Sequence, residues 1–264
     1  MKKTIISCVL FLTAVTAFSQ TPMKTAAEAK LSASDLAVKI ADRILATTTY
    51  EFKNTKTGKT YKSVKNLPLD MNVKVACKYN NWHYTNGVTH IALMELADKT
   101  GAKKYDDYVL KNMNFVFNEG NLDFFKKQYD QAMKNEGWYG VRKLSWHMIF
   151  RGKRLDDNGP MGASLIDLQM KHPNNSFLNY INETAEHLNY GEPRLADGTI
   201  ARIWPHENTI WADDAFMAIS FLARMAKMTG DMSYINDAAN QVIKYHKYLW
   251  CPEKQIYYHC YHTD

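Results

Sequence analysis

A repeated helical hairpin is the feature that most constrains the fold of this 264-residue chain. Two segments share one pattern at a constant shift of 129 positions: an apolar helix, a Thr-Gly stop, and a second helix that begins near a tyrosine. Glycine ends a helix at little steric cost because it adopts the left-handed conformation readily. The matched residues are Trp82, Ala97, Thr100, Gly101 and Tyr105 in the first copy, and Trp211, Ala226, Thr229, Gly230 and Tyr234 in the second. Since all of them keep register together, chance similarity between amphipathic helices is the weaker explanation.

A third copy of the hairpin spans residues 155–189, with His172-Pro173 in place of the Thr-Gly stop. Strand patterns are scarce, and three recurring hairpins predict a helical ring or solenoid. Residues 50–75 are polar and lack periodicity, so we expect an excursion or a small hairpin there. The periodicity predicts helices over residues 34–47, 85–99, 103–118, 121–135, 158–171, 176–189, 212–228 and 232–249.

The first nineteen residues have the pattern of a signal peptide. Lys2 and Lys3 precede an apolar run over residues 5–18, and small residues before Gln20 suit cleavage at that point. The run is too short to span a membrane, and no later stretch is long and apolar enough to serve as an anchor. We therefore expect a secreted or periplasmic protein with one catalytic domain over residues 20–264.

Charge and cysteine content narrow the class of partner. Removing residues 1–19 removes two lysines, which leaves 31 basic and 27 acidic side chains and a net charge of +4. Without a run of Lys and Arg, the chain lacks the usual pattern of a nucleic-acid or membrane surface. A mild positive excess favours an anionic substrate such as a uronic acid. Three remaining cysteines are too few for a disulfide framework.

Two aspartate doublets open apolar runs with the same local pattern. A constant shift of 56 superimposes Asp157 on Asp213, and the same shift pairs Met161 with Met217 and Ser164 with Ser220. A single aspartate at a helix start is commonly an N-cap, but a doublet offers one carboxylate for capping and one for a cavity. We predict that Asp213 and Asp157 are the catalytic carboxylates, suited to general acid and base work on a sugar. We then expect Asp156 and Asp214, the other aspartate of each doublet, to have structural roles.

Aromatic and basic residues concentrate ahead of the second doublet, over residues 197–211. Indole faces stack on sugar rings, and an arginine holds a carboxylate with paired donors. Packing is a serious competing role for Trp211 and also for Trp138, which precedes the first doublet. The predicted substrate-binding residues are Arg202, Trp204, His206, Trp211, Met217, Tyr84 and Trp82. The sequence contains no zinc-ligand spacing, phosphate loop or nucleophile motif, so we expect neither a metal nor a cofactor.

The doublet segments resemble a known pair of families. Leu155-Asp-Asp-x-Gly-x-Met-Gly-Ala and Trp211-x-Asp-Asp-x-Phe-Met are similar to the two signatures of the unsaturated glucuronyl and rhamnogalacturonyl hydrolases, glycoside hydrolase families 88 and 105. Phe124-Phe-Lys-Lys-Gln-Tyr129 and the Thr-Gly-Asp231 turn add to the resemblance, which spans residues 35–262. The Leu-Asp-Asp form favours family 105.

The resemblance implies an all-α (α/α)6 barrel, a six-hairpin toroid, that acts on an unsaturated uronic-acid oligosaccharide. Such enzymes hydrate the C4–C5 double bond of the terminal uronic acid instead of attacking the anomeric carbon. Asp213 would be the general acid and base, and Asp157 would assist by hydrogen bonding to the sugar or by tuning the pKa of Asp213. The reaction requires no metal or cofactor.

This chain differs from the two families in two respects. Eleven residues before Asp213, many relatives carry His where this chain has Arg202, which we expect to meet an anionic or hydroxyl-rich part of the substrate. The chain ends at Asp264, where relatives continue into further inner helices, so the resemblance implies a barrel truncated at its C-terminus. A truncated, non-catalytic carbohydrate-binding relative is therefore one alternative. Another (α/α)-toroid sugar enzyme, an epimerase or a lyase, is a second.

Overall fold

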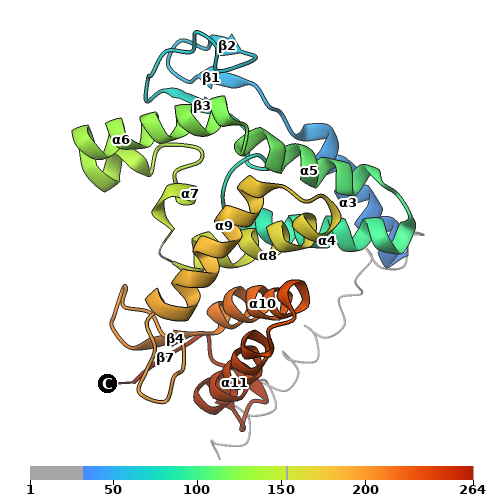
Figure 1. Ribbon diagram of the computed structural model, residues 1–264, viewed down its shortest axis with the longest axis vertical. Helices are drawn as coiled ribbons and strands as arrows, with labels where there is room; N and C mark the ends of the chain where they lie inside the picture. Colours follow the sequence, from blue (N-terminus) through green and yellow to red (C-terminus); the bar gives the residue numbers. More distant parts are fainter. Residues whose placement is uncertain (1–31, 153, 264) are drawn as a thin grey trace, which may run out of the picture. The chain divides into compact units, whose positions relative to one another are not determined.

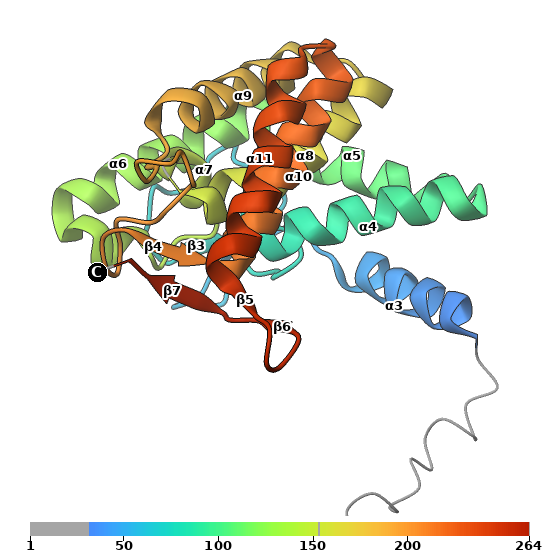
Figure 2. The same ribbon diagram turned by 90° about the horizontal axis from the view of Figure 1, so that it is seen from below.

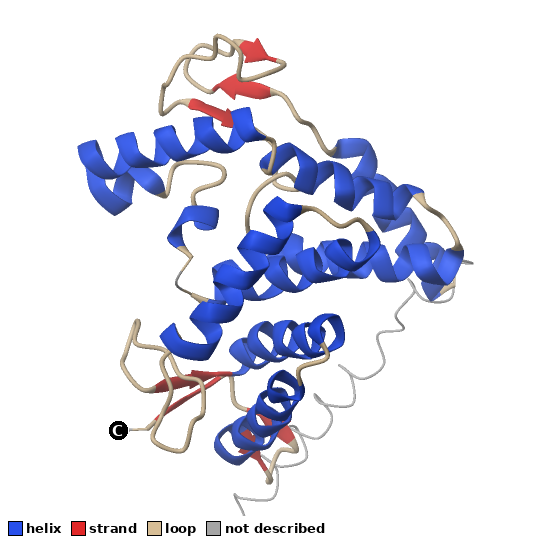
Figure 3. Ribbon diagram, in the orientation of Figure 1, coloured by secondary structure: helices blue, strands red, loops and turns tan. Residues whose placement is uncertain are grey.

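Helices make up most of the chain in the computed structural model, which describes residues 32–152 and 154–263 (Figure 3). The predicted signal peptide lies outside the described residues. Of the described residues, those up to Asp42 belong to one compact unit and those from Arg43 onward belong to a second. Helix α3 (Ala33–Thr47) begins in the first unit and ends in the second. The helical content confirms the predicted all-α class.

Three helical hairpins form the centre of the second unit (Figure 1). Their bounds are α4 (Tyr84–Thr100) with α5 (Lys104–Val116), α8 (Leu155–Lys171) with α9 (Asn175–Glu186), and α10 (Ala212–Thr229) with α11 (Met232–Leu249). The first helix of each pair packs against the first helix of the next, so α8 lies between α4 and α10. Each second helix packs against its own partner, as Figure 2 shows for α11 along α10. The three predicted hairpins are confirmed.

Two of the hairpins turn with the same atomic contacts. Gly101 and Gly230 adopt the left-handed conformation, with φ of 70° and 76°. Their amides donate to the carbonyls of Ala97 and Ala226, the paired alanines of the repeat, at 2.8 and 2.9 Å. The hydroxyl of Thr100 donates to Leu96 O at 2.6 Å, and Thr229 makes the equivalent bond one repeat later. The repeat found in the sequence therefore corresponds to the same C-terminal capping structure at the ends of two helices.

Glycine lets the first helices of the hairpins approach to backbone contact. A Cβ on Gly87 of α4 would lie 2.4 Å from the carbonyl carbon of Pro160 in α8. A Cβ on Gly159 of α8 would lie 2.5 Å from the carbonyl oxygen of Met217 in α10. Both distances are shorter than real Cβ contacts, so these positions accept no side chain without a shift of backbone. The close packing fixes the start of α8 relative to the start of α10.

Short strands and further helices connect the hairpins. The expected excursion over residues 50–75 is a three-stranded antiparallel sheet in the order β2-β1-β3. It packs beside α6 (Glu119–Val141), where Gln128 Nε2 donates to Asp70 O and Val73 O, both at 2.7 Å. The strands are β1 (Phe52–Asn54), β2 (Thr60–Tyr61) and β3 (Val73–Val75), and the short helix α7 (Met148–Arg151) precedes α8. None of the described helices combines the length and apolarity needed to cross a membrane.

The last strand of the chain supports the start of α10. Strand β7 (Cys260–His262) pairs antiparallel with β4 (Thr209–Trp211), the segment directly before the second aspartate doublet (Figure 2). Ala212 N then donates to His259 O at 2.8 Å, which continues the pairing into the first residue of the helix. A smaller pair, β5 (Trp250–Cys251) with β6 (Ile256–Tyr257), follows α11. The C-terminal strand therefore positions the doublet.

Candidate active site

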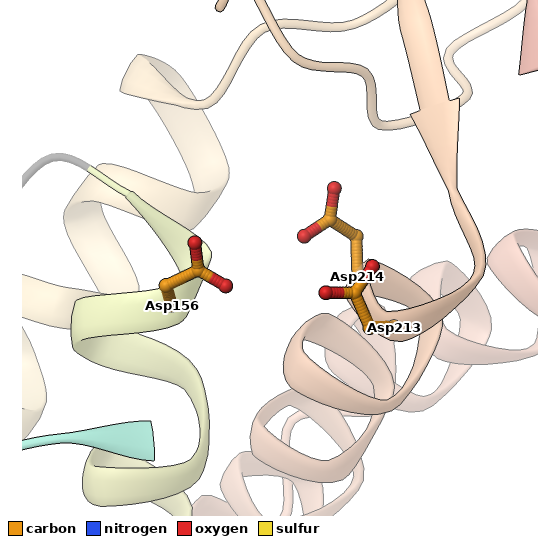
Figure 4. Close-up of side chains that lie close together, drawn as sticks. All are labelled: Asp156, Asp213 and Asp214. Atoms are coloured by element: carbon orange, nitrogen blue, oxygen red, sulfur yellow. The ribbon is translucent and has the colours of Figure 1, made fainter. Parts of the chain in front are cut away.

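The second residue of each of two neighbouring helices is an aspartate, and the two carboxylates face each other. Asp156 is the second residue of α8, and Asp213 is the second residue of α10. Figure 4 shows the carboxylate of Asp156 reaching from α8 toward Asp213 and Asp214. Carboxylate oxygens of these three residues lie within 4.8 Å of one another. Two helix N-termini, whose dipoles favour negative charge, thus converge on a cluster of three acids.

The third residue of each helix is a buried aspartate bound to an arginine by two hydrogen bonds. Arg151, the last residue of α7, donates from Nε and Nη2 to the two carboxylate oxygens of Asp157. Arg202 donates from Nε and Nη2 to the two oxygens of Asp214, at 2.6 and 2.7 Å. Neither helix has a side-chain N-cap. The buried carboxylates therefore pair with arginines instead of capping their helices.

The structure places the two members of the first doublet the other way round from the prediction. Asp157 has no exposed surface, whereas 28% of the side chain of Asp156 is exposed. The cause is the start of α8, which lies at Leu155, three residues before the predicted start. Counted from the helix starts, the equivalence is a shift of 57 and not 56. It pairs Asp156 with Asp213 and Asp157 with Asp214. Asp214 is buried, as expected for a structural member.

Arg202 is the cation at the centre of the acid cluster. Besides its two bonds to Asp214, its Nη2 lies 3.3 Å from Asp213 Oδ2 and 3.5 Å from Asp156 Oδ1. Its guanidinium also lies over the ring of Trp211, with Cζ 4.7 Å from the ring centroid. Burial lowers the pKa of Arg202. The nearby carboxylates, of which Asp214 has the largest effect, raise it by more than burial lowers it, so the guanidinium stays charged.

The two buried aspartates of the site, Asp214 and Asp157, hold a proton more readily than isolated acids do. Burial raises the pKa of Asp214 to about 6, because the lowering effect of Arg202 is opposed by the charges of Asp213 and Asp156. Burial likewise raises the pKa of Asp157, against the lowering effect of Arg151. A proton is therefore available within the cluster up to mildly acidic pH. General acid chemistry near neutral pH needs such a reservoir.

Asp213 has an exposed side chain and a carboxylate oxygen without a hydrogen-bond partner among the described residues. Its side chain is 41% exposed, the most of the three clustered acids. Oδ2 meets Arg202, while Oδ1 is buried and has no hydrogen-bond partner among the described residues. A buried carboxyl oxygen without a partner costs free energy that a proton or a bound hydroxyl would recover. Of the three acids, Asp213 therefore has the most capacity for a new bond.

A cavity of about 740 Å³ opens beside the acid cluster. It is lined by acidic, basic and aromatic side chains, a combination that suits a charged sugar. Three of its lining residues are arginines (Arg151, Arg154 and Arg202) and three are acidic (Asp156, Glu192 and Asp214), so its walls offer both cationic and carboxylate groups to a ligand. The lining residues are Tyr129, Trp138, Phe150, Arg151, Arg154, Leu155, Asp156, His187, Gly191, Glu192, Pro193, Arg202, Ile203, Trp204 and Asp214.

Four of the predicted substrate-binding residues lie in or around the cluster. Arg202 and Trp204 line the cavity, and Trp204 is 60% exposed. Trp211 lies under Arg202 and packs edge-on against His259. His206 is exposed near β7, where its ring contacts that of His262 at 5.4 Å between centroids. Of these four, only Arg202 and Trp204 belong to the cavity wall.

The other three predicted residues lie away from the cavity wall. Trp82 is fully buried, and its Nε1 donates to the carbonyl of Asp157 at 2.9 Å. Met217 is also buried, because its backbone contacts Gly159. Neither offers a surface to a sugar, so the structure gives both a packing role. Tyr84 is exposed at the start of α4, against the ring of His83, and does not line the cavity.

Several residues at the site carried no sequence signal strong enough to single them out. Arg151 and Arg154 flank a stretch without periodicity, although both come shortly before the first doublet. His83 lies near Asp156, which opposes the lowering of its pKa by burial. His187 and Glu192 line the cavity and bond at 2.8 Å through Nε2 and Oε2. That last pair forms at a π-helical turn, His187–Gly191, which the sequence does not predict.

The acid cluster has the spacing of a cation site, since three carboxylates can supply oxygen ligands. Arg202 already lies against all three, however, and directs its donors to the oxygens that an ion would bind. The donor set therefore does not call for a metal.

Comparisons with known proteins identify the class of fold and family. The family model described as Glycosyl Hydrolase Family 88 matches residues 56–264. Two similar solved structures, described as possible members of the GH105 family, come from Salmonella enterica serovar Paratyphi A and Klebsiella pneumoniae. Each has a TM-score of 0.54 and 14% identity; the match covers 89% and 90% of this chain, respectively, and 53% of each relative.

A third solved structure, a family 105 glycoside hydrolase from C. acetobutylicum, has a TM-score of 0.51 and 21% identity. The match covers 75% of this chain and 46% of the relative. No curated protein matches the chain. These findings confirm the resemblance to families 88 and 105 and the all-α toroid class of the fold. The chain spans about half the length of the solved structures that it matches.

Proposed function

The chain belongs to glycosyl hydrolase family 88, and on that basis we propose that it releases a terminal unsaturated uronic acid from oligosaccharides produced by a rhamnogalacturonan or pectin lyase. The observation that carries this proposal is the facing pair Asp156 and Asp213, joined through Arg202 at the edge of a cavity rich in arginine. A proton-holding acid cluster beside a cavity with three arginines suits protonation of a charged, unsaturated sugar.

The proposed reaction adds water across the C4–C5 double bond. The Asp213 carboxyl gives its proton to C4, and the π electrons of the double bond form the new C–H bond. Water then adds to the cationic C5, and its released proton returns to the Asp213 carboxylate. The resulting C5 hemiketal opens to a ketone, and the neighbouring sugar leaves from C1. The catalyst ends in its starting protonation state.

Each member of the cluster has a separate part in this proposal. Asp213 transfers the proton because it is the exposed acid with an unsatisfied oxygen. Asp156, and not Asp157, is the second carboxylate, since only Asp156 reaches the cluster. Asp214 holds Arg202 in place and keeps protons in the cluster through its raised pKa. Trp204 offers an exposed indole face on which a sugar ring can stack.

The ultraviolet absorbance of the conjugated double bond tests this function. The purified chain is mixed with rhamnogalacturonan-lyase products, and Asp213→Asn serves as the comparison. We expect wild type to remove the absorbance and the variant to lose roughly 10²- to 10⁴-fold in rate, the usual contribution of a general acid. A folded wild-type sample that leaves the absorbance unchanged would show that the proposal is wrong.

We also propose that the protein is exported to the periplasm or the medium. The proposal is supported by the sequence pattern of residues 1–19, with two lysines ahead of an apolar run and small residues before Gln20. N-terminal sequencing of the protein recovered from outside the cytoplasm tests it. A mature chain that begins at Gln20 is the expected result, and an uncleaved cytoplasmic chain contradicts it.

A further inference from the structure

Three arginines line the cavity, and they differ in what they bind. Arg151 is held by Asp157, and Arg202 is held by Asp214, Asp213 and Asp156. The guanidinium of Arg154 makes no ion pair and no hydrogen bond within residues 32–152 and 154–263. Arg154 is therefore the cavity arginine whose donors are available to a ligand.

A contact with an aromatic ring orients this guanidinium without using its donors. Cζ of Arg154 lies 4.7 Å from the centroid of the Trp204 ring, a cation–π contact. An arginine stacked in this way keeps its N–H groups in the guanidinium plane, where they can bind both oxygens of a carboxylate. Trp204 itself is largely exposed. The pair thus presents a flat apolar face beside a fork of free donors.

The electrostatic surroundings of Arg154 favour an incoming anion. Burial lowers its pKa, and the positive charges of Arg151 and Arg202 lower it further. Asp157 and Asp156 oppose that effect from nearby, but neither forms an ion pair with it. Each of these two carboxylates already lies against another arginine. A guanidinium crowded by like charges, and without a carboxylate of its own, gains from binding one.

We propose that Arg154, stacked on Trp204, binds the carboxylate of the terminal unsaturated uronic acid and sets the preference for charged sugars. The proposal rests on the proposed function. The carboxylate carbon is bonded directly to C5, so holding it fixes the double bond that accepts the proton. Arg154 precedes Asp156 by two residues, which puts the anchor and the acid cluster on one wall of the cavity.

This assignment replaces the one expected from the sequence. The sequence predicts that Arg202 meets an anionic or hydroxyl-rich part of the substrate, but in the structure its donors are directed to three aspartates. A substrate carboxylate there would displace or repel the acids that hold the proton. Arg202 is instead a positioning residue that organises the acid cluster.

The test compares a substrate that carries the carboxylate with one that does not. An unsaturated galacturonyl-rhamnose disaccharide and its methyl ester are assayed with wild type, Arg154→Gln and Arg142→Gln. Arg142 is a matched control because it is exposed and lies outside the cavity. We expect wild type to favour the acid by roughly 10- to 100-fold in kcat/KM, the range that a charged hydrogen bond supplies. Arg154→Gln should lose this preference, mainly through a higher KM for the acid, whereas Arg142→Gln should retain it.

The outcomes separate this proposal from the function on which it rests. An Arg154→Gln variant that retains the acid-over-ester preference overturns the assignment of Arg154. If wild type converts neither compound, the proposed function fails, and calorimetric binding of the two compounds then decides about Arg154. Acid-selective binding that disappears in Arg154→Gln supports the site. Binding that does not distinguish the acid from the ester, or no binding, overturns it.

If Arg154→Gln does not fold, Arg154→Lys replaces it in the assay. Lysine keeps the positive charge but lacks the paired N–H donors of arginine, so we expect a partial loss of the preference for the acid.

Discussion

Asp156 and Asp213 occupy the same position in two neighbouring helices, and both contact the same nitrogen. Each is the second residue of its helix, and Nη2 of Arg202 lies 3.5 Å from Asp156 and 3.3 Å from Asp213. Their successors, Asp157 and Asp214, are both buried and doubly bonded to an arginine. Each doublet therefore has the same arrangement, with one partly exposed aspartate followed by one buried aspartate.

This division predicts that neutralising the two members of the first doublet has different effects. Asp157→Asn replaces one of the two oxygens that accept from Arg151 by an NH2 group, which cannot accept, and we expect it to lower the free energy of unfolding by roughly 1 to 3 kcal/mol. Asp156→Asn removes a partly exposed charge at 3.5 Å from Arg202, so the loss should stay under about 1 kcal/mol. Urea unfolding of both variants measures the difference. Equal losses would contradict the assignment of Asp157 as the structural member.

The raised pKa of Asp214 predicts a pH-dependent contribution to stability. The folded state keeps this proton up to about pH 6, whereas the unfolded state releases it near 3.8. The stabilising contribution is therefore complete below pH 3.8 and is lost as the pH rises through 6. Relative to Asp214→Asn, wild type should lose on the order of 2 to 3 kcal/mol of unfolding free energy over that interval. A difference that grows with pH would mean that Arg202 outweighs burial.

The backbone contact between α8 and α10 predicts that Gly159→Ala destabilises the fold. Its Cβ would meet the carbonyl oxygen of Met217 at 2.5 Å, so the helices must separate. We expect a loss of about 1 to 3 kcal/mol. Gly120→Ala is the matched control, because the nearest atom to its Cβ is a side-chain atom at 3.4 Å. Thermal unfolding of the two variants decides, and similar melting temperatures would argue against close packing at Gly159.

The position of Arg202 predicts that the acid cluster binds no divalent cation in the wild-type protein. Its guanidinium already lies against all three carboxylates and occupies the place between them. The melting temperature should therefore be the same with EDTA and with millimolar Ca²⁺ or Mg²⁺. Arg202→Gln removes that charge, and its melting temperature should rise with added cation. A cation-dependent increase in wild type would contradict this account of the site.

The hairpins were predictable from the sequence because their signals are local. Thr100-Gly101 and Thr229-Gly230 stop helices through contacts within four residues, so the pattern alone locates both turns. The predicted ranges for α10 and α11 agree with the structure to within one residue. The short sheet and the π-helical turn depend on packing against other segments. The sequence predicts only an excursion or a small hairpin over residues 50–75, and a helix that continues to residue 189 where the structure has the π-helical turn.

The orientation of the first doublet was not predictable in the same way. An α-helix turns by about 100° per residue, so a shift of one position directs a side chain to a different side. The shift of 56 aligns Met161 with Met217, whereas the helix starts differ by 57. The partner that buries Asp157 is Arg151 of α7, a single turn too short to show periodicity. Only the folded chain brings that arginine to the doublet.

The most direct test of the account is to follow where solvent hydrogen enters the product. The purified chain is allowed to act on rhamnogalacturonan-lyase products in D₂O, and early product is examined by NMR, with Asp213→Asn as control. Hydration by Asp213 predicts one deuterium at C4, delivered to one face, together with loss of the double bond, and no product from the variant at comparable times. Release of the neighbouring sugar with the double bond intact and no deuterium at C4 would place the reaction at the anomeric carbon and contradict the mechanism.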